Sequence, residues 1–232
     1  MWTDVVDLNE FYQSPLGQVA RRLIRRRMRE IWPDVRGMTV LGMGYATPYL
    51  RSYRGEAERV IAAMPAQQGV IHWPEDAPGQ VMLTEETELP LPDLSVDRLL
   101  LVHAVENSEN LRAMMREAWR VLADGGRLLV VVPNRRGIWA RFEQRSPFGH
   151  GHPYSQSQLR RLLRDCLFTP MSTAHALFMP PSHWRARNRE DSRERDLAAL
   201  ARQGFSYDTA RRVIECENRQ TLEASLETDD WQ

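Results

Sequence analysis

The chain has 232 residues, a mass of 27.0 kDa, 42% hydrophobic residues and a formal net charge of zero. This length is sufficient for one medium domain with a sizeable core, and the neutral charge argues against general electrostatic capture of nucleic acid. Since no apolar run reaches the length of a membrane span and the first residues lack the pattern of a secretion signal, we expect a cytoplasmic protein with no membrane partner.

Cysteine and lysine usage excludes several kinds of chemistry. The two cysteines, Cys166 and Cys216, lie in helical patterns without a CxxC spacing. They predict buried free thiols rather than a disulfide framework, a zinc cluster or a redox pair. No lysine occurs in the chain, which excludes a lysine Schiff base and the lysine of a phosphate-binding P-loop.

The first predicted element is a long helix that begins at Ser14-Pro15, after residues 1–13, which show no regular pattern. One face of this helix carries an apolar stripe, formed by Leu16, Val19, Ala20, Leu23, Ile24, Met28 and Ile31. The other face is rich in arginine. Such a face can bind RNA or lipid, but the zero net charge favours a solvated face on a packed helix. We interpret residues 1–36 as an N-terminal helical segment.

Short apolar runs alternate with helical patterns from Gly37 onward. They predict strands at residues 38–41, 59–63, 81–83, 98–102 and 127–132. One helix is predicted at residues 49–57. A second is predicted between the last two strands, where apolar residues recur at helical spacing: Leu111, Met114, Met115, Ala118 and Leu122. Its end is marked by Asp124-Gly125-Gly126.

This order of elements predicts an α/β fold over residues 37–183. We expect a three-layer, doubly wound, Rossmann-like arrangement with a mostly parallel sheet. Ser155 and Gln158 form a capping box for a further helix, and a sixth strand is predicted at residues 171–179. Residues 184–232 are then expected to form a charged linker and a helical C-terminal extension.

Two stretches of the chain carry a family resemblance. LPLPDLSVDRLLLVHAVE, at residues 89–106, is similar to LPFPDxSFDxVxxxHxLEH, and REAWRVLADGGRLLVVVPN, at residues 116–134, is similar to REhxRVLxPGGxLhhxxPN. Over roughly residues 37–180 the chain resembles the class I S-adenosylmethionine-dependent methyltransferases, in particular the type 11 methyltransferase domain. The resemblance implies S-adenosylmethionine as cofactor and methyl transfer by in-line displacement in a pocket at the carboxyl ends of the strands.

The loop after the first predicted strand corresponds to the cofactor loop of this family. The family pattern is VLDxGxGxG, in which the glycines let the backbone approach the cofactor. Here VLGMGYATP places Gly42 at the acidic position, Gly44 at the first glycine, Ala46 at the second and Pro48 at the third, with Tyr45 after Gly44. Two glycines are missing, so the motif is degenerate.

The resemblance implies three further site positions at strand ends. The family's second strand ends in a carboxylate that binds both ribose hydroxyls, and Met64 stands there in this chain. The adenine-side acid falls on Glu85, with Glu86 one residue away. His103 lies where the family lines the space beside the transferred methyl group, but it could equally be a hydrogen-bonded residue that caps the strand. The cofactor-binding residues implied are Gly42, Gly44, Tyr45, Ala46, Met64, Glu85 and His103.

Two main functional hypotheses result. In the first, the chain is an active methyltransferase that aligns the nucleophile with an already activated methyl group and excludes water. His103 is then the catalytic base, with Tyr154 or Glu106 behind it, although Glu106 also suits a helix start or a surface. The acceptor is unidentified, and we expect a small molecule rather than nucleic acid or protein. In the second hypothesis, the degenerate motif has left an inactive binding or scaffold protein.

A third hypothesis, a metal-dependent hydrolase, depends on His150 and His152 in FGHGHPYS. No carboxylate or third histidine has a recognisable ligand spacing, so we expect no metal site. The glycines and proline of this segment instead predict a loop that closes over bound substrate.

Overall fold

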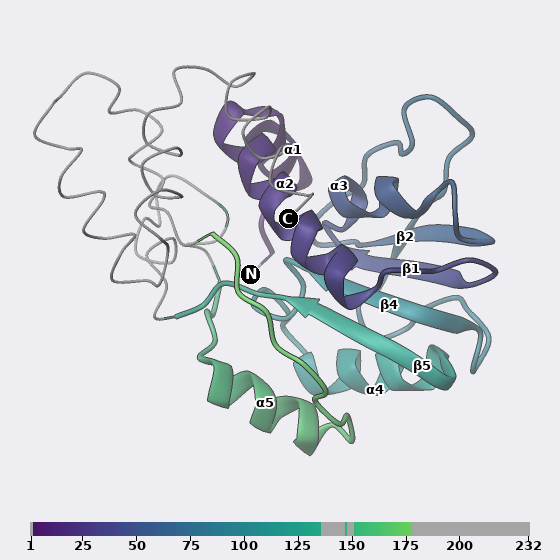
Figure 1. The fold of residues 1–232 in the computed structure, drawn as a ribbon, viewed down its shortest axis with the longest axis vertical. Coiled ribbons are helices and arrows are strands. Elements are labelled where there is room, and N and C mark those ends of the chain that lie inside the picture. Colours follow the sequence, from purple (N-terminus) through teal and green to yellow (C-terminus); the bar gives the residue numbers. More distant parts are fainter. Residues whose placement is uncertain (1, 136–146, 148–150, 178–232) are drawn as a thin grey trace, which may run out of the picture. The chain divides into compact units, whose positions relative to one another are not determined.

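We describe the protein from a computed structural model, which defines residues 2–135, 147 and 151–177 (Figure 1). The helical tail predicted after residue 184, together with His150 and Cys216, lies outside these residues. The elements follow in chain order as α1 (Val5–Gln13), α2 (Pro15–Ile31), β1 (Thr39–Gly44), α3 (Thr47–Leu50), the short 3-10 helix η1 (Arg51–Tyr53), β2 (Arg59–Pro65), β3 (Val81–Thr84), β4 (Val96–Val102), α4 (Leu111–Val121), β5 (Leu122–Val131) and α5 (Gln156–Asp165).

The five strands form one parallel sheet in the order β3-β2-β1-β4-β5. In the central strand, Gly42 pairs with Ala62 of β2 on one side and with Leu100 of β4 on the other. The chain winds outward in one direction through β2 and β3 and then crosses to β4. In parallel sheets of this kind, ligands bind at the carboxyl ends of the strands beside such a reversal. The predicted doubly wound, Rossmann-like α/β fold is confirmed.

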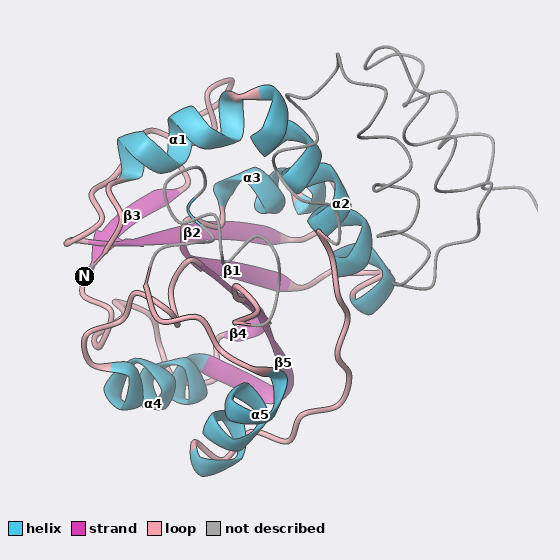
Figure 2. Ribbon diagram, turned by 90° about the vertical axis from the view of Figure 1, so that its left-hand side faces the viewer, coloured by secondary structure: helices cyan, strands magenta, loops and turns pink. Residues whose placement is uncertain are grey.

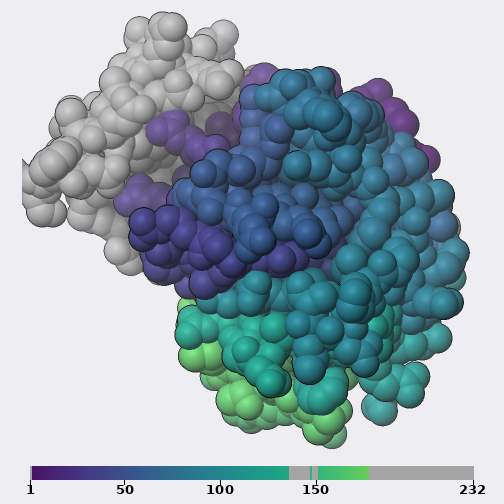
Figure 3. Space-filling view, turned by 90° about the vertical axis from the view of Figure 1, so that its right-hand side faces the viewer, coloured from purple at the N-terminus to yellow at the C-terminus, as the bar shows by residue number. Residues whose placement is uncertain are grey.

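Helices cover both faces of the sheet, which gives the three predicted layers. The views in Figure 1 and Figure 2 place α1, α2 and α3 on one side of the sheet and α4 and α5 on the other. The first layer buries Ile24 and Met28 of α2 against the sheet, and the second buries Met114 and Ala118 of α4. In the space-filling view, the green residues of α5 and its surroundings lie against the teal surface of the β4–α4–β5 unit (Figure 3). No helix among the described residues is long and apolar enough to cross a membrane.

The N-terminal residues are more ordered than the sequence patterns predicted. Residues 5–13 form helix α1, whose N-cap is Asp4, which accepts the Val6 amide at 2.7 Å. The helix buries Val5, Leu8 and Tyr12. The expectation of no regular pattern before Ser14 is therefore wrong. The predicted start of α2 is confirmed, because Ser14 caps it and Pro15 is its first residue.

Two other predicted elements differ from the structure. The helix expected at residues 49–57 is reduced to α3 and η1, because the chain turns back early and the Glu58 amide already donates to the Met38 carbonyl. The strand expected at residues 171–179 is absent from its described part, residues 171–177, where Ala176 and Leu177 pack against the core instead. The capping box of α5 is formed by Ser155 and Gln158 as predicted.

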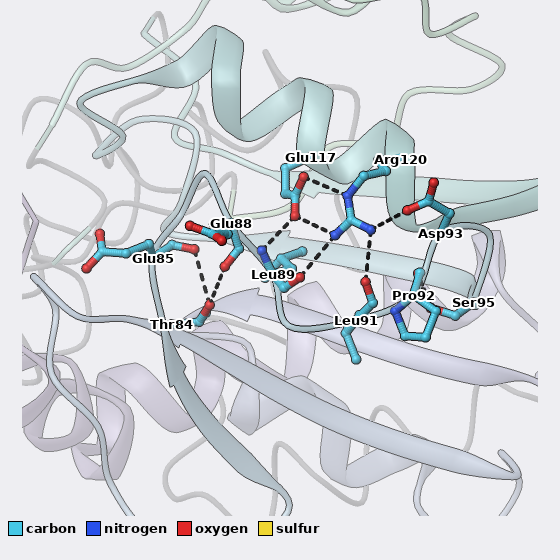
Figure 4. A network of polar contacts seen from close by, with 10 residues as sticks. All are labelled: Thr84, Glu85, Glu88, Leu89, Leu91, Pro92, Asp93, Ser95, Glu117 and Arg120. Carbon is cyan, nitrogen blue, oxygen red and sulfur yellow. Dashed lines mark hydrogen bonds and ion pairs between the residues drawn. The ribbon is translucent and has the colours of Figure 1, made fainter.

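The segment between β3 and β4 is fastened to α4 by Arg120 (Figure 4). The guanidinium group donates to the carbonyls of Leu89 and Leu91, at 3.0 and 2.9 Å. It also binds Glu117 through two nitrogens, at 2.6 and 2.9 Å, and Asp93 at 2.5 Å. Glu117 in turn accepts the Leu89 amide at 2.6 Å. Three backbone polar groups of the LPLPD stretch, the Leu89 amide and the carbonyls of Leu89 and Leu91, thus have partners on one helix.

Candidate active site at the carboxyl edge of the sheet

The candidate site lies where β1, β2 and β4 end side by side. These strands end at Gly44, Pro65 and Val102, and β1 lies between the other two. The loops that follow carry most of the residues implied by the resemblance. Among the described residues, α1 is the element that touches all three loops through printed contacts: Gln68 after β2, Tyr45 after β1 and His103 after β4.

The end of β1 is shaped by two glycines that leave no room for a side chain. Gly44 has a φ of +79°, and a Cβ added there would lie 2.2 Å from the Val102 carbonyl oxygen of β4. A Cβ on Gly42 would lie 2.6 Å from the Ala46 Cβ and 2.7 Å from Leu50 of α3. The acid of the family pattern therefore cannot stand at position 42 of this backbone, because α3 fills the space it would need.

His103 follows β4 directly and is held in a strained conformation. Its φ is +51°, a region that non-glycine residues seldom adopt, and its exposed fraction is 1%. The Asn107 side-chain amide Nδ2 donates to the His103 carbonyl at 3.0 Å, which helps to hold this backbone. The side chain is thereby pointed into a buried polar cluster and not toward solvent.

The imidazole of His103 connects a carboxylate with a phenol. Its Nδ1 lies 3.2 Å from Glu106 Oε1, and its Nε2 lies 2.9 Å from the Tyr12 hydroxyl. With a neutral imidazole and an ionised Glu106, the carboxylate can only accept a hydrogen bond. The ring proton is then on Nδ1, and Nε2 accepts from the Tyr12 hydroxyl. The Tyr12 oxygen lies 3.0 Å from that of Tyr49. A chain of hydrogen bonds thus runs from Glu106 through His103 to two tyrosines.

Burial keeps these tyrosines protonated. It raises the pKa of Tyr12 well above its ordinary value, and the neighbouring Tyr49 and Glu106 add to the shift. It likewise raises the pKa of Tyr49 and of Tyr45. The ring of Tyr45 stacks on that of Tyr12, with 5.5 Å between the ring centres. Near neutral pH, the cluster therefore contains hydroxyl groups that can donate to the imidazole.

Helix α1 crosses the carboxyl edge from β2 to β4. Near its start, the Val5 amide donates to the Gln68 carbonyl at 2.9 Å, and near its end Tyr12 reaches His103. The helix rises about 10 Å between Val5 and Tyr12, and two strand spacings measure about 9.6 Å. The helix therefore has the length needed to cover the end of β1 and to meet the loops on either side.

Met64 is placed in the apolar core. It has an exposed fraction of 0% and belongs to the cluster that contains Val5, Leu8 and Tyr45. A thioether cannot accept the two hydrogen bonds that the family's carboxylate makes with a ribose. Within this backbone, position 64 contributes packing and no polar contact.

The two acidic residues after β3 have different environments. Glu85 is exposed and accepts from the Gln67 amide at 3.0 Å, which joins the ends of β2 and β3. Glu86 is buried and accepts the amides of Glu109 and Asn110, at 3.2 and 2.8 Å, where α4 begins. Glu86 therefore stabilises the start of α4, whereas the Glu85 carboxylate is exposed and accessible to a ligand.

Several buried polar atoms around this edge lack a hydrogen-bond partner among the described residues. They are Trp2 Nε1, both side-chain polar atoms of Gln68, Glu86 Oε2, Glu106 Oε2, Asn107 Oδ1 and Ser108 Oγ. An unpaired buried polar atom costs about 1–3 kcal/mol. Such a concentration at the carboxyl ends of a parallel sheet is typical of a site whose ligand supplies the missing partners.

The segment that follows residue 150 lies against the β4 loop. The His152 amide donates to the Glu106 carbonyl at 2.8 Å, and a Cβ on Gly151 would lie 2.6 Å from the same oxygen. Glu106, which we considered a helix-start or surface residue, is instead buried, with an exposed fraction of 1%. The closure of this loop over substrate stays a prediction, because residues 148–150 lie outside the described part.

The structure offers no support for metal chemistry in the residues that it defines. Residues 2–135, 147 and 151–177 contain no group of three or more potential metal ligands. His152 is exposed, and Cys166, at the end of α5, is half-buried with a thiol pKa raised by burial.

Sequence patterns missed Tyr12, Tyr49 and Gln68. A signal for the first existed, since Asp4 is a good N-cap and Val5, Leu8 and Tyr12 follow at helical spacing. The contact between Tyr12 and His103 joins positions 91 residues apart, and no local pattern reveals it.

The parallel sheet with helices on both faces is a Rossmann-like fold, and comparison with known proteins relates it to methyltransferases. Residues 40–130 match the methyltransferase domain family. Two Mycobacterium tuberculosis proteins, from strains CDC 1551 and H37Rv and described as probable S-adenosylmethionine-dependent methyltransferases, are each 33% identical over 118 residues. These matches cover 50% of this chain and 43% of each relative, so the chain spans less than half the length of these relatives.

Solved structures show the same fold. An S-adenosylmethionine-dependent methyltransferase of Thermotoga maritima superposes with a TM-score of 0.52 at 18% identity, over 70% of this chain and 76% of that protein. One from Archaeoglobus fulgidus gives a TM-score of 0.51 at 19% identity, over 68% and 71%. Residues 40–130 therefore match a methyltransferase domain, and the two relatives similar in sequence are described as S-adenosylmethionine-dependent.

Proposed function

We propose that this chain is a methyltransferase that binds S-adenosylmethionine at the carboxyl edge of the sheet and transfers its methyl group to a small molecule. The observation that carries the proposal is the buried His103, held by Glu106 on Nδ1 and by a phenolic hydroxyl on Nε2. A hydroxyl already fits at Nε2. The acceptor that suits this nitrogen is therefore an O–H or N–H group that replaces the Tyr12 hydroxyl.

In this proposal the chain's own residues orient the acceptor and remove its proton. The cofactor supplies an activated methyl group, so the protein needs few catalytic groups. His103 Nε2 takes the acceptor's proton, and the Glu106 carboxylate stabilises the imidazolium that results. The buried surroundings exclude water from the reacting atoms, which also strengthens the charge interaction between His103 and Glu106.

The residues present fit the cofactor in part. Gly42, Gly44 and Ala46 bring backbone to the edge with little or no side chain, and Tyr45 lies between them with its ring stacked on Tyr12. Glu85 is accessible and can accept from the adenine amino group when Gln67 releases it. The unpaired buried atoms beside these loops provide donors and acceptors for the polar ends of the cofactor. Met64 provides an apolar wall only.

The second candidate is a protein that binds ligand without transferring a methyl group. It is favoured by the position of α1, which places Tyr12 on His103 and Val5 against the end of β2. In this case Tyr12 would stay on Nε2 and no acceptor would reach it. The two candidates differ in whether methylated product forms, not in whether the cofactor binds.

Two measurements test the proposal. Titration calorimetry with S-adenosylmethionine should show binding by the purified protein. Mass spectrometry of small-molecule fractions incubated with methyl-labelled cofactor should then show a labelled product. With the acceptor found, His103→Asn should lower kcat by about 100-fold or more, the range for loss of a general base, and the exposed His72→Asn should not.

The outcomes separate the candidates. Binding without product in any fraction would favour the binding protein, and absence of binding at millimolar cofactor would contradict both. Glu106→Gln should lower kcat less than His103→Asn and move the acidic limb of the pH–rate profile to lower pH, because loss of the neighbouring negative charge lowers the proton affinity of the imidazole.

A further inference from the structure

We propose that the side-chain amide of Gln68 binds the ribose hydroxyls of the cofactor, in place of the carboxylate that Met64 lacks. This inference rests on the proposed function, and it assigns a binding role to a residue outside every motif in the sequence. It is carried by the position of Gln68, by its burial and by its two unpaired polar atoms.

The backbone holds Gln68 at the end of β2. Its amide donates to the Pro65 carbonyl at 2.9 Å, which closes a turn directly after the strand. Its carbonyl accepts the Val5 amide at 2.9 Å, which fixes it to the first turn of α1. The residue therefore lies one turn beyond the strand end at which the resemblance expects ribose recognition.

The side chain of Gln68 is buried without a partner among the described residues. Its exposed fraction is 1%, and neither Nε2 nor Oε1 has a hydrogen bond. A buried primary amide that makes no hydrogen bond is costly, since both its donor and its acceptor have lost water. Nothing in the packing of the free protein accounts for a polar residue at this position, where methionine or leucine would fit the same volume.

The chemistry of a primary amide matches that of a vicinal diol. Nε2 can donate to one ribose oxygen while Oε1 accepts from the other hydroxyl, so one planar group serves both. An amide is neutral and can be buried without a counter-charge, unlike a carboxylate. This suits a site whose other wall is the apolar Met64.

Other residues near the end of β2 fit the role less well. Gln67 is exposed, and its amide is already bound to Glu85. Tyr45 donates its hydroxyl to Asn9 at 3.0 Å. Access to Gln68 requires the start of α1 to move, and there Val5 also lies close to Gly69, where an added Cβ would be 3.1 Å from its side chain. Binding should therefore displace Val5 while leaving β2 in place.

The test combines two ligands with two substitutions in the full chain. Calorimetry with S-adenosylhomocysteine and with its 2′,3′-dideoxy analogue gives the preference for the ribose hydroxyls. The wild type should prefer the hydroxylated ligand by about tenfold or more, the equivalent of one or two well-placed hydrogen bonds. Gln68→Met should lose this preference. Gln80→Met, on an exposed glutamine, should keep it.

A second readout excludes a purely structural role. Because Gln68→Met removes an unpaired buried amide, the free variant should melt at the same temperature as the wild type or higher. A Gln68→Met variant that keeps the wild-type preference between the two ligands would overturn the assignment, whatever its stability. A wild type that binds both ligands equally would overturn it too while leaving the proposed function intact, whereas a wild type that binds neither would overturn both. If Gln68→Met does not fold, Gln68→Leu applies the same test, and it should lose the preference.

Discussion

The loop around Arg120 and the carboxyl edge of the sheet both bury polar groups, but they do so in opposite ways. Around Arg120, the carbonyls of Leu89 and Leu91 and the amide of Leu89 all have partners, and these come from one helix. At the carboxyl edge, atoms of Gln68 and Glu106 are buried without partners among the described residues. The named backbone groups of the first region have partners within the protein, whereas the second region leaves buried polar atoms that a bound ligand can pair with.

This difference explains where the family resemblance is strong and where it is weak. The LPLPD stretch and the helix that carries Arg120 match the family pattern closely, and both serve the internal network of Figure 4. Positions 42 and 64 depart from the pattern, and both contact the layer formed by α1 and α3. A resemblance based on the first region therefore reports the fold, while details of ligand binding must come from the second.

The largest effect is expected from Met64→Asp. The aspartate would enter a fully buried apolar cluster without a counter-ion, so we expect a loss of more than about 4 kcal/mol in the free energy of unfolding. Urea denaturation measures it. Met64→Leu is the matched control and should cost less than about 1.5 kcal/mol. Tighter cofactor binding by a stable Met64→Asp variant would contradict the placement of position 64 in the apolar core, because the new carboxylate would then reach the ribose hydroxyls.

A loss of about 3 kcal/mol is expected from Gly44→Ala. The new Cβ would meet the Val102 carbonyl at 2.2 Å, and the positive φ adds its own cost. Gly125→Ala provides the control, since its φ is also positive but a Cβ there would meet nothing within 4 Å. Thermal melting of both variants separates backbone strain from the clash. Similar losses for the two would contradict a close approach of β1 and β4.

Arg120→Met should cost about 2–3 kcal/mol, because it removes the guanidinium donor from the Leu91 carbonyl and takes one of the donors from the Leu89 carbonyl and from the Glu117 carboxylate. Arg116→Met, on an exposed arginine of the same helix, should be near neutral. The affinity for S-adenosylhomocysteine should be unchanged in both. A selective loss of affinity in Arg120→Met at full folding would mean that the two regions are coupled.

Tyr12→Phe should cost about 1–2 kcal/mol, since it removes the hydroxyl that joins Tyr49 to His103. The pKa of Tyr12 is raised in the folded state, so its contribution is complete below the ordinary value of 10.0 and is lost as pH rises toward the folded value. The variant should therefore lose less stability than the wild type above about pH 10. Parallel alkaline profiles for the two proteins would contradict a buried, neutral Tyr12.

The sequence predicted the framework of this protein better than its site, for a physical reason. Strands and the long helices depend on local periodicity, so β1 to β5, α2 and α4 could be found from short stretches. The site depends on α1 crossing three loops, and its contacts join Val5 to Gln68 and Tyr12 to His103. The burial of Glu106 and the unpaired amide of Gln68 are consequences of that packing, and no local pattern encodes them.

Hydrogen exchange measured by mass spectrometry, with and without S-adenosylhomocysteine, tests the central claim most directly. If the cofactor binds at the carboxyl edge, ligand should slow exchange in the loops after β1, β2 and β4, at residues 43–50, 65–70 and 103–108, and should change it in α1. Exchange in residues 89–95 and in α4 should stay as it is in the free protein. Equal protection of both regions, or protection confined to residues 89–95, would contradict the assignment of the carboxyl edge as the binding site.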